Sequence, residues 1–395
     1  MRNRIFIAPM CQYSCEGRDG VPTDWHSVHY GSRAVGGAGL IIVEATGITP
    51  DGRISPWDTG IWNDTQVDAW KKITDLISSH GAKSAIQLAH AGRKASTHRA
   101  ISGVNSISIE DGGWVPVSST DEPFTDYVTP RKLTTEEVHE NVKDWQRAAA
   151  RSVAAGFDAI EIHAAHGYLI HQFLSPITNK RDDEFGGSLE NRARFLLEVI
   201  RAIRSVIPEG MPLFVRFSAT DYREDGWDLE QTKTVAAWCA AEGVDLFDIS
   251  SGGLVTGVTI PLGPGYQVPL AQGVAAAVSQ PVSAVGMITD PQQAEDILQN
   301  GVDVISIARQ SLRDLPADQG GVVAIDATSY WTIDDDPTTG IATLEVPDSI
   351  TAGVSTAAAE NGVLTLVYDI EIEEAGGRVF TWLTGKLPIA QQVTA

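Results

Sequence analysis

Cysteine is scarce in this sequence of 395 residues, and the scarcity excludes two kinds of framework. Cys11, Cys15 and Cys239 are the only three, too few and too irregularly spaced for a disulfide framework. No cysteine follows position 239, so the C-terminal part of the chain cannot build an iron–sulfur or zinc cluster from thiolates.

Basic residues and long apolar runs are also in short supply. Lys and Arg total 29 against 51 Asp and Glu, which gives a formal net charge of -22. Such a charge repels phosphate backbones and anionic lipid surfaces, so nucleic acid and membrane are poor candidate partners and a small molecule is the better one. No apolar stretch reaches the roughly 18 residues of a membrane span. The stretch from Arg2 to Met10 is too short and proline-marked for a signal peptide, so we expect a cytoplasmic protein.

What the sequence does contain is a repeated alternation of short apolar strands and helical patterns, typical of βαβ units around a parallel sheet. Eight strands are predicted near Arg4–Ala8, Leu40–Ala45, Ser84–Leu88, Ala159–His163, Leu213–Phe217, Asp245–Ser250, Val282–Gly286 and Val302–Ile307. Helical patterns between them include Val67–Ser79, Thr135–Ala155, Leu189–Val206 and Gln292–Asn300. Eight such units predict a closed (β/α)8 TIM barrel. A doubly wound open sheet is the alternative, but it usually has a glycine-rich dinucleotide turn after an early strand, and none is present.

Two segments depart from this alternation. The connection from Arg93 to Lys132 is polar and lacks helical periodicity, and long loops of this kind are often lids or binding loops. From about Pro316 the pattern changes to strand-like runs at Val322–Ile333, Thr343–Val346, Val363–Ile372 and Arg378–Leu383. Twelve acidic residues against two basic ones give this tail a charge of -10. We predict the barrel over residues 1–315 and a small acidic β-rich domain, or a fused segment of unknown role, over residues 316–395.

Polar residues follow the ends of the predicted strands, where barrel enzymes place their active sites. The set comprises Cys11, Tyr13, Ala45, Thr46, Gln87, His163, His166, Tyr168, Arg216 and Arg309. Two histidines three apart could ligate a metal, but a zinc site would want a third ligand with clear spacing. Beside a tyrosine they suit another task, which is to grip a carbonyl oxygen while a phenol supplies a proton.

Arg216 and the glycine-containing ends of the last two strands indicate an anionic ligand. A structural salt bridge is one interpretation of Arg216, but an unpaired guanidinium inside a barrel mouth is unfavourable, which favours an anion as its partner. Gly286 and the Ala308–Arg309 step fall where many barrels bind a phosphate, although a tight βα turn is the alternative. A phosphate there and an aromatic ring system over the mouth together describe FMN.

Several ordered segments together resemble the old yellow enzyme family, in its branch with Cys and Tyr after the first strand. They are Ala8-Pro-Met-Cys-Gln-Tyr-Ser14, Thr23-Asp-Trp-His26, Glu44-Ala-Thr46, Ile86-Gln-Leu-Ala-His-Ala-Gly-Arg-Lys94, the run from His163 to Pro176, the run from Arg181 to Arg192, Phe214-Val-Arg-Phe-Ser218, Gly263-Pro-Gly-Tyr266 and Val285-Gly-Met-Ile-Thr289. The resemblance implies an FMN-dependent ene-reductase. Such an enzyme takes hydride from NADPH or NADH and then reduces an electron-poor alkene such as an enone, in a two-step, ping-pong cycle.

The resemblance also assigns roles to residues. Those expected at the flavin are Ala8, Pro9, Met10, Cys11, Ala45, Gln87, Arg216, Gly286, Ala308 and Arg309. His163 and His166 would donate hydrogen bonds to the substrate carbonyl, and Tyr168 would protonate the α-carbon. Tyr13 and Cys11 would line the substrate pocket, and no metal is expected. The acidic cluster Asp182–Glu184 is interpreted as structural.

The sequence also departs from the family pattern. Residues that usually precede Arg2 and the usual helical C-terminus after Leu315 are replaced or absent, and Ala308 stands where Gly is usual. In this branch the C-terminus can reach a neighbouring subunit, so the resemblance implies a homo-oligomer as a candidate state. A catalytically weak flavin-binding or scaffold barrel that carries a β-rich binding or assembly module is therefore the alternative hypothesis.

Overall fold

Eight parallel strands close into a barrel in the first of two units of the chain. The computed structural model describes residues 1–99 and 105–312 and, in the C-terminal part, the backbone of four strands. The units are Met1–Arg313 and Asp314–Ala395. The barrel strands are β1 (Ile5–Ile7), β2 (Leu40–Gly47), β3 (Lys83–Ala89), β6 (Ala159–Ala164), β7 (Leu213–Ser218), β8 (Leu246–Ser250), β9 (Val282–Ala284) and β10 (Val304–Ile307). They pair in that order and β10 closes on β1, which confirms the predicted TIM barrel.

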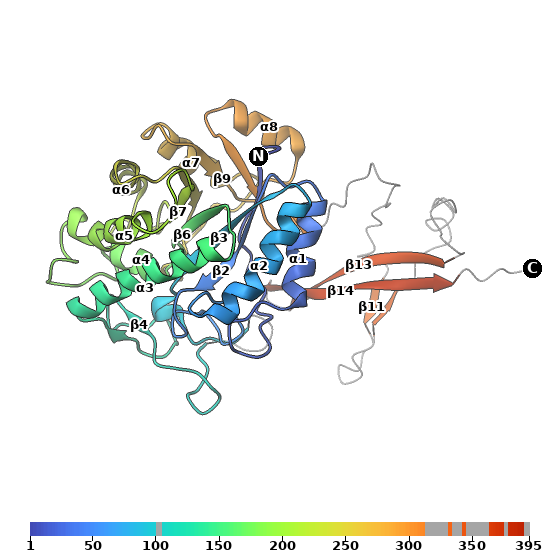
Figure 1. Ribbon diagram of the computed structural model, residues 1–395, viewed down its shortest axis with the longest axis horizontal. Helices are drawn as coiled ribbons and strands as arrows, with labels where there is room; N and C mark the ends of the chain where they lie inside the picture. The colour runs from blue at the N-terminus through green and yellow to red at the C-terminus, as the bar shows by residue number, and fades with distance from the viewer. Residues whose placement is uncertain (100–104, 313–330, 334–341, 345–362, 375–377, 391–395) are drawn as a thin grey trace, which may run out of the picture. The chain divides into compact units, whose positions relative to one another are not determined.

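Helices cover the outside of this sheet (Figure 1). They are α1 (Asp24–Val35), α2 (Asp64–Ser79), α3 (Thr135–Ala154), α4 (Leu169–Leu174), α5 (Leu189–Arg204), α6 (Leu229–Ala241), α7 (Val268–Ala275) and α8 (Pro291–Gln299). Polar caps begin several of them: Asn63 accepts from Gln66 N–H and Thr134 from Glu137 N–H, which satisfies donors that the first helical turn leaves free. Among the described residues no helix is long and apolar enough to cross a membrane.

The barrel interior is layered, and the layering places the site. A buried apolar cluster fills the amino-terminal half and consists of Phe6, Leu40, Ile42, Ala85, Ala159, Phe214, Leu246 and Val304. Because side chains alternate along a strand, residues two positions further on face the same interior. Those positions hold buried polar groups, including Gln87, Glu161, Arg216 and Asp248. The interior is therefore sealed by apolar packing below and polar towards the carboxyl ends of the strands, which we call the barrel mouth.

The long connection after β3 has little regular structure. It contains a short 3-10 turn, Gly92–Lys94, and a pair of two-residue strands, β4 (Val117–Ser118) and β5 (Arg131–Lys132). Gln172 ties it to the barrel: its amide nitrogen donates to Ala91 O, and Ser118 Oγ donates to its amide oxygen.

The second unit contains antiparallel strand pairs. They are β11 (Trp331–Ile333) with β12 (Ala342–Leu344), and β13 (Val363–Glu374) with β14 (Arg378–Ala390). The strand-like character predicted for the tail is found in these segments. The remainder of the predicted run Val322–Ile333 lies outside the described residues.

Candidate active site

Strand register brings the predicted site residues of the barrel interior together. Ala45 pairs with Gln87 across β2 and β3, and His163 pairs with Arg216 across β6 and β7. Gln87 Nε2 donates to Glu161 Oε1 at 2.8 Å, and both side chains are buried. The predicted polar ends of these strands thus form one continuous arc at the barrel mouth.

The segment after β1 supplies the adjacent wall. Ala8 N–H donates to Ile307 O at 2.9 Å, which holds the start of the segment against β10. Cys11, Tyr13 and Tyr168 pack against a small cluster that includes Ala45. Pro9 and Met10, which lie between Ala8 and Cys11 in the sequence, are partly exposed. Both predicted substrate-pocket residues therefore lie with the predicted proton donor.

His163, His166 and Tyr168 are neighbours in space. The ring centroids of His163 and Tyr168 are 4.8 Å apart, and those of the two histidines 5.2 Å. His163 Nδ1 accepts from Ala165 N–H at 3.3 Å, so its hydrogen lies on Nε2. His166 Nε2 is 2.7 Å from Ser250 Oγ, whose own hydrogen goes to Gln267 Oε1. His166 therefore also carries its hydrogen on Nε2 and donates it to the serine.

Burial keeps all three of these side chains neutral. It lowers the pKa of both imidazoles well below the usual range, and the Arg216 cation lowers it further. Burial likewise raises the pKa of the Tyr168 phenol well above its usual range, with the Cys11 thiol as the next cause. The wall consequently offers neutral N–H and O–H donors.

Arg216 has a partner in the neighbouring strand. Its Nε lies 3.1 Å from Asp248 Oδ2, with both side chains almost fully buried, so the salt-bridge interpretation describes one edge of the guanidinium. The contact lacks the alignment of a hydrogen bond. No hydrogen bond to the described residues uses either terminal nitrogen. Burial, followed by the Asp248 charge, raises the pKa of the adjacent Glu161 carboxyl to about 8.

The predicted phosphate end has a backbone that only glycine adopts readily. Gly286 has φ +117°, and a Cβ there would come within 2.7 Å of Gln267 Nε2. Its carbonyl oxygen accepts from Gly265 N–H at 2.8 Å. Ala308 is partly exposed and Arg309 is exposed, so that the guanidinium is open to a ligand.

Sequence reasoning missed several buried polar residues that support this wall. His26 and His171 occur in the quoted motifs but received no role, although each is fully buried beside a buried carboxylate, Glu44 and Asp221 respectively. The sequence did contain a signal for this. A histidine among the apolar residues of a motif is expected to be buried with them and then needs a polar partner. The partners themselves are distant in sequence and could not be paired without the fold.

Other sequence interpretations concern residues outside the mouth. Asp183 binds Arg181 and Thr135, and Glu184 lies 3.3 Å from His139, so members of the Asp182–Glu184 cluster make structural contacts, as predicted. No group of three or more His, Cys, Asp or Glu side chains that could hold a metal occurs within the residues described.

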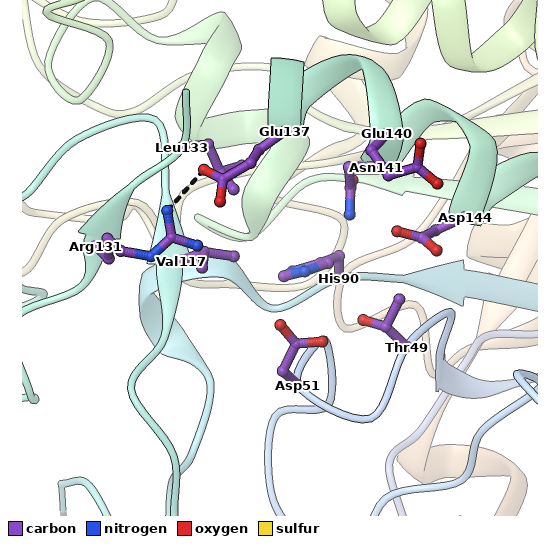
Figure 2. Close-up of a pocket in the computed structure, with 10 residues that line it drawn as sticks. All are labelled: Thr49, Asp51, His90, Val117, Arg131, Leu133, Glu137, Glu140, Asn141 and Asp144. Carbon is purple, nitrogen blue, oxygen red and sulfur yellow. Dashed lines mark hydrogen bonds and ion pairs between the residues drawn. The ribbon is translucent and has the colours of Figure 1, made fainter. Parts of the chain in front are cut away.

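A separate pocket of about 150 Å³ lies beside α3 (Figure 2). Its lining residues are Thr49, Asp51, His90, Val117, Arg131, Leu133, Glu137, Glu140, Asn141 and Asp144. Arg131 pairs with Glu137 at 2.6 Å. None of the predicted site residues lines it, so the strand-end geometry, and not this pocket, marks the candidate site.

A parallel barrel with neutral donors and a buried arginine at its mouth is compatible with an oxidoreductase that works through a bound flavin, and the comparison with known families decides the class. Residues 1–317 match the model of the NADH:flavin oxidoreductase / NADH oxidase family. The chain belongs to this family, the old yellow enzyme family, and is an NAD(P)H-dependent FMN oxidoreductase.

Individual relatives agree with this placement. NADPH dehydrogenases of Listeria monocytogenes and Bacillus licheniformis are 48% identical over 315 residues, which cover 80% of this chain and 88% of each relative. Among solved structures, a 2-naphthoyl-CoA reductase complex has a TM-score of 0.70 at 31% identity and covers 78% of this chain and 48% of that one. Morphinone reductase has a TM-score of 0.65 at 28% identity, with 78% and 82% covered.

The residues at the mouth fit FMN. The terminal nitrogens of Arg216 make no hydrogen bond to the described residues, and Gly286, with its positive φ, brings no side chain to its turn. Gln87 offers an amide next to the Glu161 carboxyl. An anionic ring system with a pyrimidine edge and a phosphate matches this set of groups.

Proposed function

We propose that the enzyme reduces the activated C=C bond of α,β-unsaturated carbonyl compounds, in two half-reactions that share the barrel mouth. The observation that carries the proposal is the neutral His163 imidazole, with hydrogen on Nε2, 4.8 Å from the Tyr168 ring. When bound, FMN supplies hydride transfer, which links oxidation of NADPH to reduction of the alkene. The remaining chemistry belongs to side chains of the chain itself.

His163 and His166 stabilise the negative charge that develops on the carbonyl oxygen. A neutral imidazole N–H keeps its hydrogen while it binds the enolate oxygen, because loss of that hydrogen would form an imidazolate, which is a stronger base than the enolate. The His163 hydrogen makes no bond to the described residues, whereas His166 donates to Ser250 and would exchange that partner for the substrate. Tyr168 gives its phenolic proton to the α-carbon.

The other predicted residues hold and shape the site in this proposal. Tyr13 and Cys11 form the substrate wall beside Tyr168. Arg216 would stabilise the negative charge of the reduced flavin, and Gln87 would bind its pyrimidine edge. Ala8, Pro9, Met10 and Ala45 would line the flavin further, and Gly286, Ala308 and Arg309 would hold its phosphate.

The direct test is the visible spectrum of the purified protein, followed anaerobically. A bound-flavin spectrum that bleaches with NADPH and returns with cyclohexenone supports both half-reactions. If NADPH bleaches the flavin spectrum but the enone does not restore it, the enzyme oxidises NADPH and does not reduce this alkene. The double variant His163→Ala/His166→Ala should retain the flavin and its bleaching but lose most of the return.

A further inference from the structure

Glu44 occupies an irregular position in strand β2. The ladder with β3 passes from the pair Val43–Ile86 directly to the pair Ala45–Gln87, so that Glu44 has no partner across it. This is a β-bulge, a feature that re-aims a side chain and is common next to active sites. With regular alternation, Glu44 would face the barrel interior and Ala45 would face outward. The bulge reverses these orientations, so that Ala45 faces the mouth.

The Glu44 carboxylate is fully buried, accepts two hydrogen bonds and lies against a third polar group, the His26 imidazole, in a contact that lacks the alignment of a hydrogen bond. Tyr30 Oη donates to Oε1 at 3.0 Å, and His26 Nε2 lies 3.1 Å from the same oxygen. His26 Nδ1 accepts from Thr23 N–H at 2.9 Å, which places the imidazole hydrogen on Nε2, towards the carboxylate. The other oxygen, Oε2, accepts from Gln12 N–H at 2.8 Å. A buried carboxylate with these contacts is held in one orientation.

The Gln12 contact matters because of its two neighbours. Gln12 lies between Cys11 and Tyr13, the two residues of the substrate wall. Tyr13 has φ 51°, a left-handed conformation that a non-glycine residue keeps only when its surroundings hold it. The Gln12 side chain is held as well, since its Nε2 donates to Met10 O and Trp25 Nε1 donates to its Oε1. The Glu44 carboxylate thus ties the backbone of the wall to β2.

We infer that Glu44, oriented by His26 and Tyr30, is a positioning residue that fixes Cys11 and Tyr13 at the barrel mouth. The inference rests on the proposed function only in that these two side chains contact the substrate. Glu44 itself touches neither substrate nor flavin in this scheme. Its role assigns a purpose to the Thr23–His26 and Glu44–Thr46 segments.

Charge and geometry must be separated in the test. Burial, then the charge of Asp58, then that of Glu44, raise the pKa of the Cys11 thiol, while its hydrogen bonds to the Ala45 backbone and to Tyr13 lower it. Asp58 binds Ile54 N–H and Ser55 Oγ and has no bond to the wall segment. Asp58→Asn is therefore a matched control that removes a nearby charge and leaves the Gln12 contact in place.

The experiment measures alkylation of Cys11 by iodoacetamide at pH 8.5 in the flavin-bound protein, together with KM and kcat for cyclohexenone. Cys15 and Cys239 are buried, and Cys11→Ala gives the background rate. Both Glu44→Gln and Asp58→Asn should speed alkylation about three- to tenfold, because removal of either negative charge should lower the pKa of the Cys11 thiol by about half to one unit. Only Glu44→Gln should also raise the enone KM, by about three- to tenfold, the size of one net hydrogen bond.

The reason is that a glutamine amide cannot satisfy this site. If its oxygen accepts from Gln12 N–H, its NH2 group faces the donors of Tyr30 and His26. Tyr30→Phe is a milder second variant that keeps the charge and the Gln12 contact but releases one carboxylate oxygen. It should raise KM with little change in alkylation.

An enone KM equal to that of the wild type in both Glu44→Gln and Tyr30→Phe would overturn the inference. Failure of the proposed function is recognised separately: the wild type would then not return its flavin with enone. In that case the alkylation rates of Tyr30→Phe, Glu44→Gln and Asp58→Asn still measure how strongly the Glu44 charge acts on the Cys11 thiol. A Glu44→Gln rate no higher than the wild-type rate would then count against a role at Cys11.

Discussion

Single side chains at and around the barrel mouth have ionisation states that differ from those of the same residues in water. Burial lowers the pKa of Lys94 to about 8, with Arg93 as the second cause. Its Nζ donates to His166 O at 3.0 Å and to Gly253 O at 2.9 Å, which fixes the backbone of one histidine. Because the interior favours uncharged forms, His163, His166 and Tyr168 act as neutral donors near the Arg216 cation.

Tyr168 should matter for one half-reaction only. Tyr168→Phe removes the phenolic proton and keeps the ring, so we expect alkene reduction to slow by about a hundredfold, the lower end of general acid catalysis, because solvent can replace the proton in part. Reduction of the flavin by NADPH needs no proton from this group and should not change. Stopped-flow measurement of each half-reaction tests this. An unchanged alkene step would mean that solvent supplies the proton.

The sequence predicted which residues would meet at the mouth better than it predicted what each would contact. Strand ends converge by topology, so His163, Tyr168 and Arg216 could be placed without coordinates. The partner of Arg216 could not, because Asp248 belongs to the next strand and looked like an ordinary strand residue. The bond from His166 to Ser250 depends on a side-chain rotation for which no sequence pattern exists.

At the scale of elements, contacts at the start of α4 hold the segment that carries His166 and Tyr168. His171 Nδ1 accepts from Gly167 N–H at 2.9 Å, and its Nε2 lies 3.0 Å from Asp221 Oδ1, with both side chains fully buried. Asp221 Oδ2 accepts from Ser175 Oγ and from Trp227 N–H. Burial raises the pKa of Asp221, but His171 and these bonds outweigh it and bring the pKa below its usual value.

Asp221→Asn should therefore loosen the segment that carries His166 and Tyr168. Its amide nitrogen would face a donor, so we expect the free energy of unfolding to fall by about 2 kcal/mol, the value of a hydrogen bond to a charged group. The kcat for enone should fall as well. Urea denaturation and steady-state kinetics measure both effects. Asp225→Asn is the control, because that exposed residue pairs with Arg223 at the surface and its loss should change stability little.

Regular elements were predicted well because period alone specifies them, and irregular ones were not. All eight barrel strands and the long helices follow from apolar spacing. The bulge at Glu44 did not, since one extra residue in a buried run looks the same as a longer strand. The short strands β4 and β5 lie in a polar loop, where pairing depends on distant contacts.

At the scale of the whole molecule, every proposed site residue lies in the first unit, Met1–Arg313. The strand ladder also closes within it, because β10 pairs with β1. A chain that ends at Arg313 should therefore bind FMN and be reduced by NADPH as the full chain is. Flavin content and bleaching of both proteins compare them directly. Loss of flavin from the shorter chain would show that the second unit contributes to the site.

The free energy of unfolding should depend on pH through the buried carboxyl group of Asp58. Burial raises the pKa of Asp58 to about 7, so the folded protein keeps this proton at pH values where the unfolded chain has lost it. The resulting stabilisation is complete below about pH 4 and is lost as the pH rises to about 7. Asp58→Asn imitates the protonated form, so its stability relative to the wild type should improve from pH 5 to pH 8 by on the order of 2 kcal/mol. Urea denaturation at the two pH values, with flavin occupancy matched, gives this difference. An equal difference at both would show that Asp58 is ionised throughout.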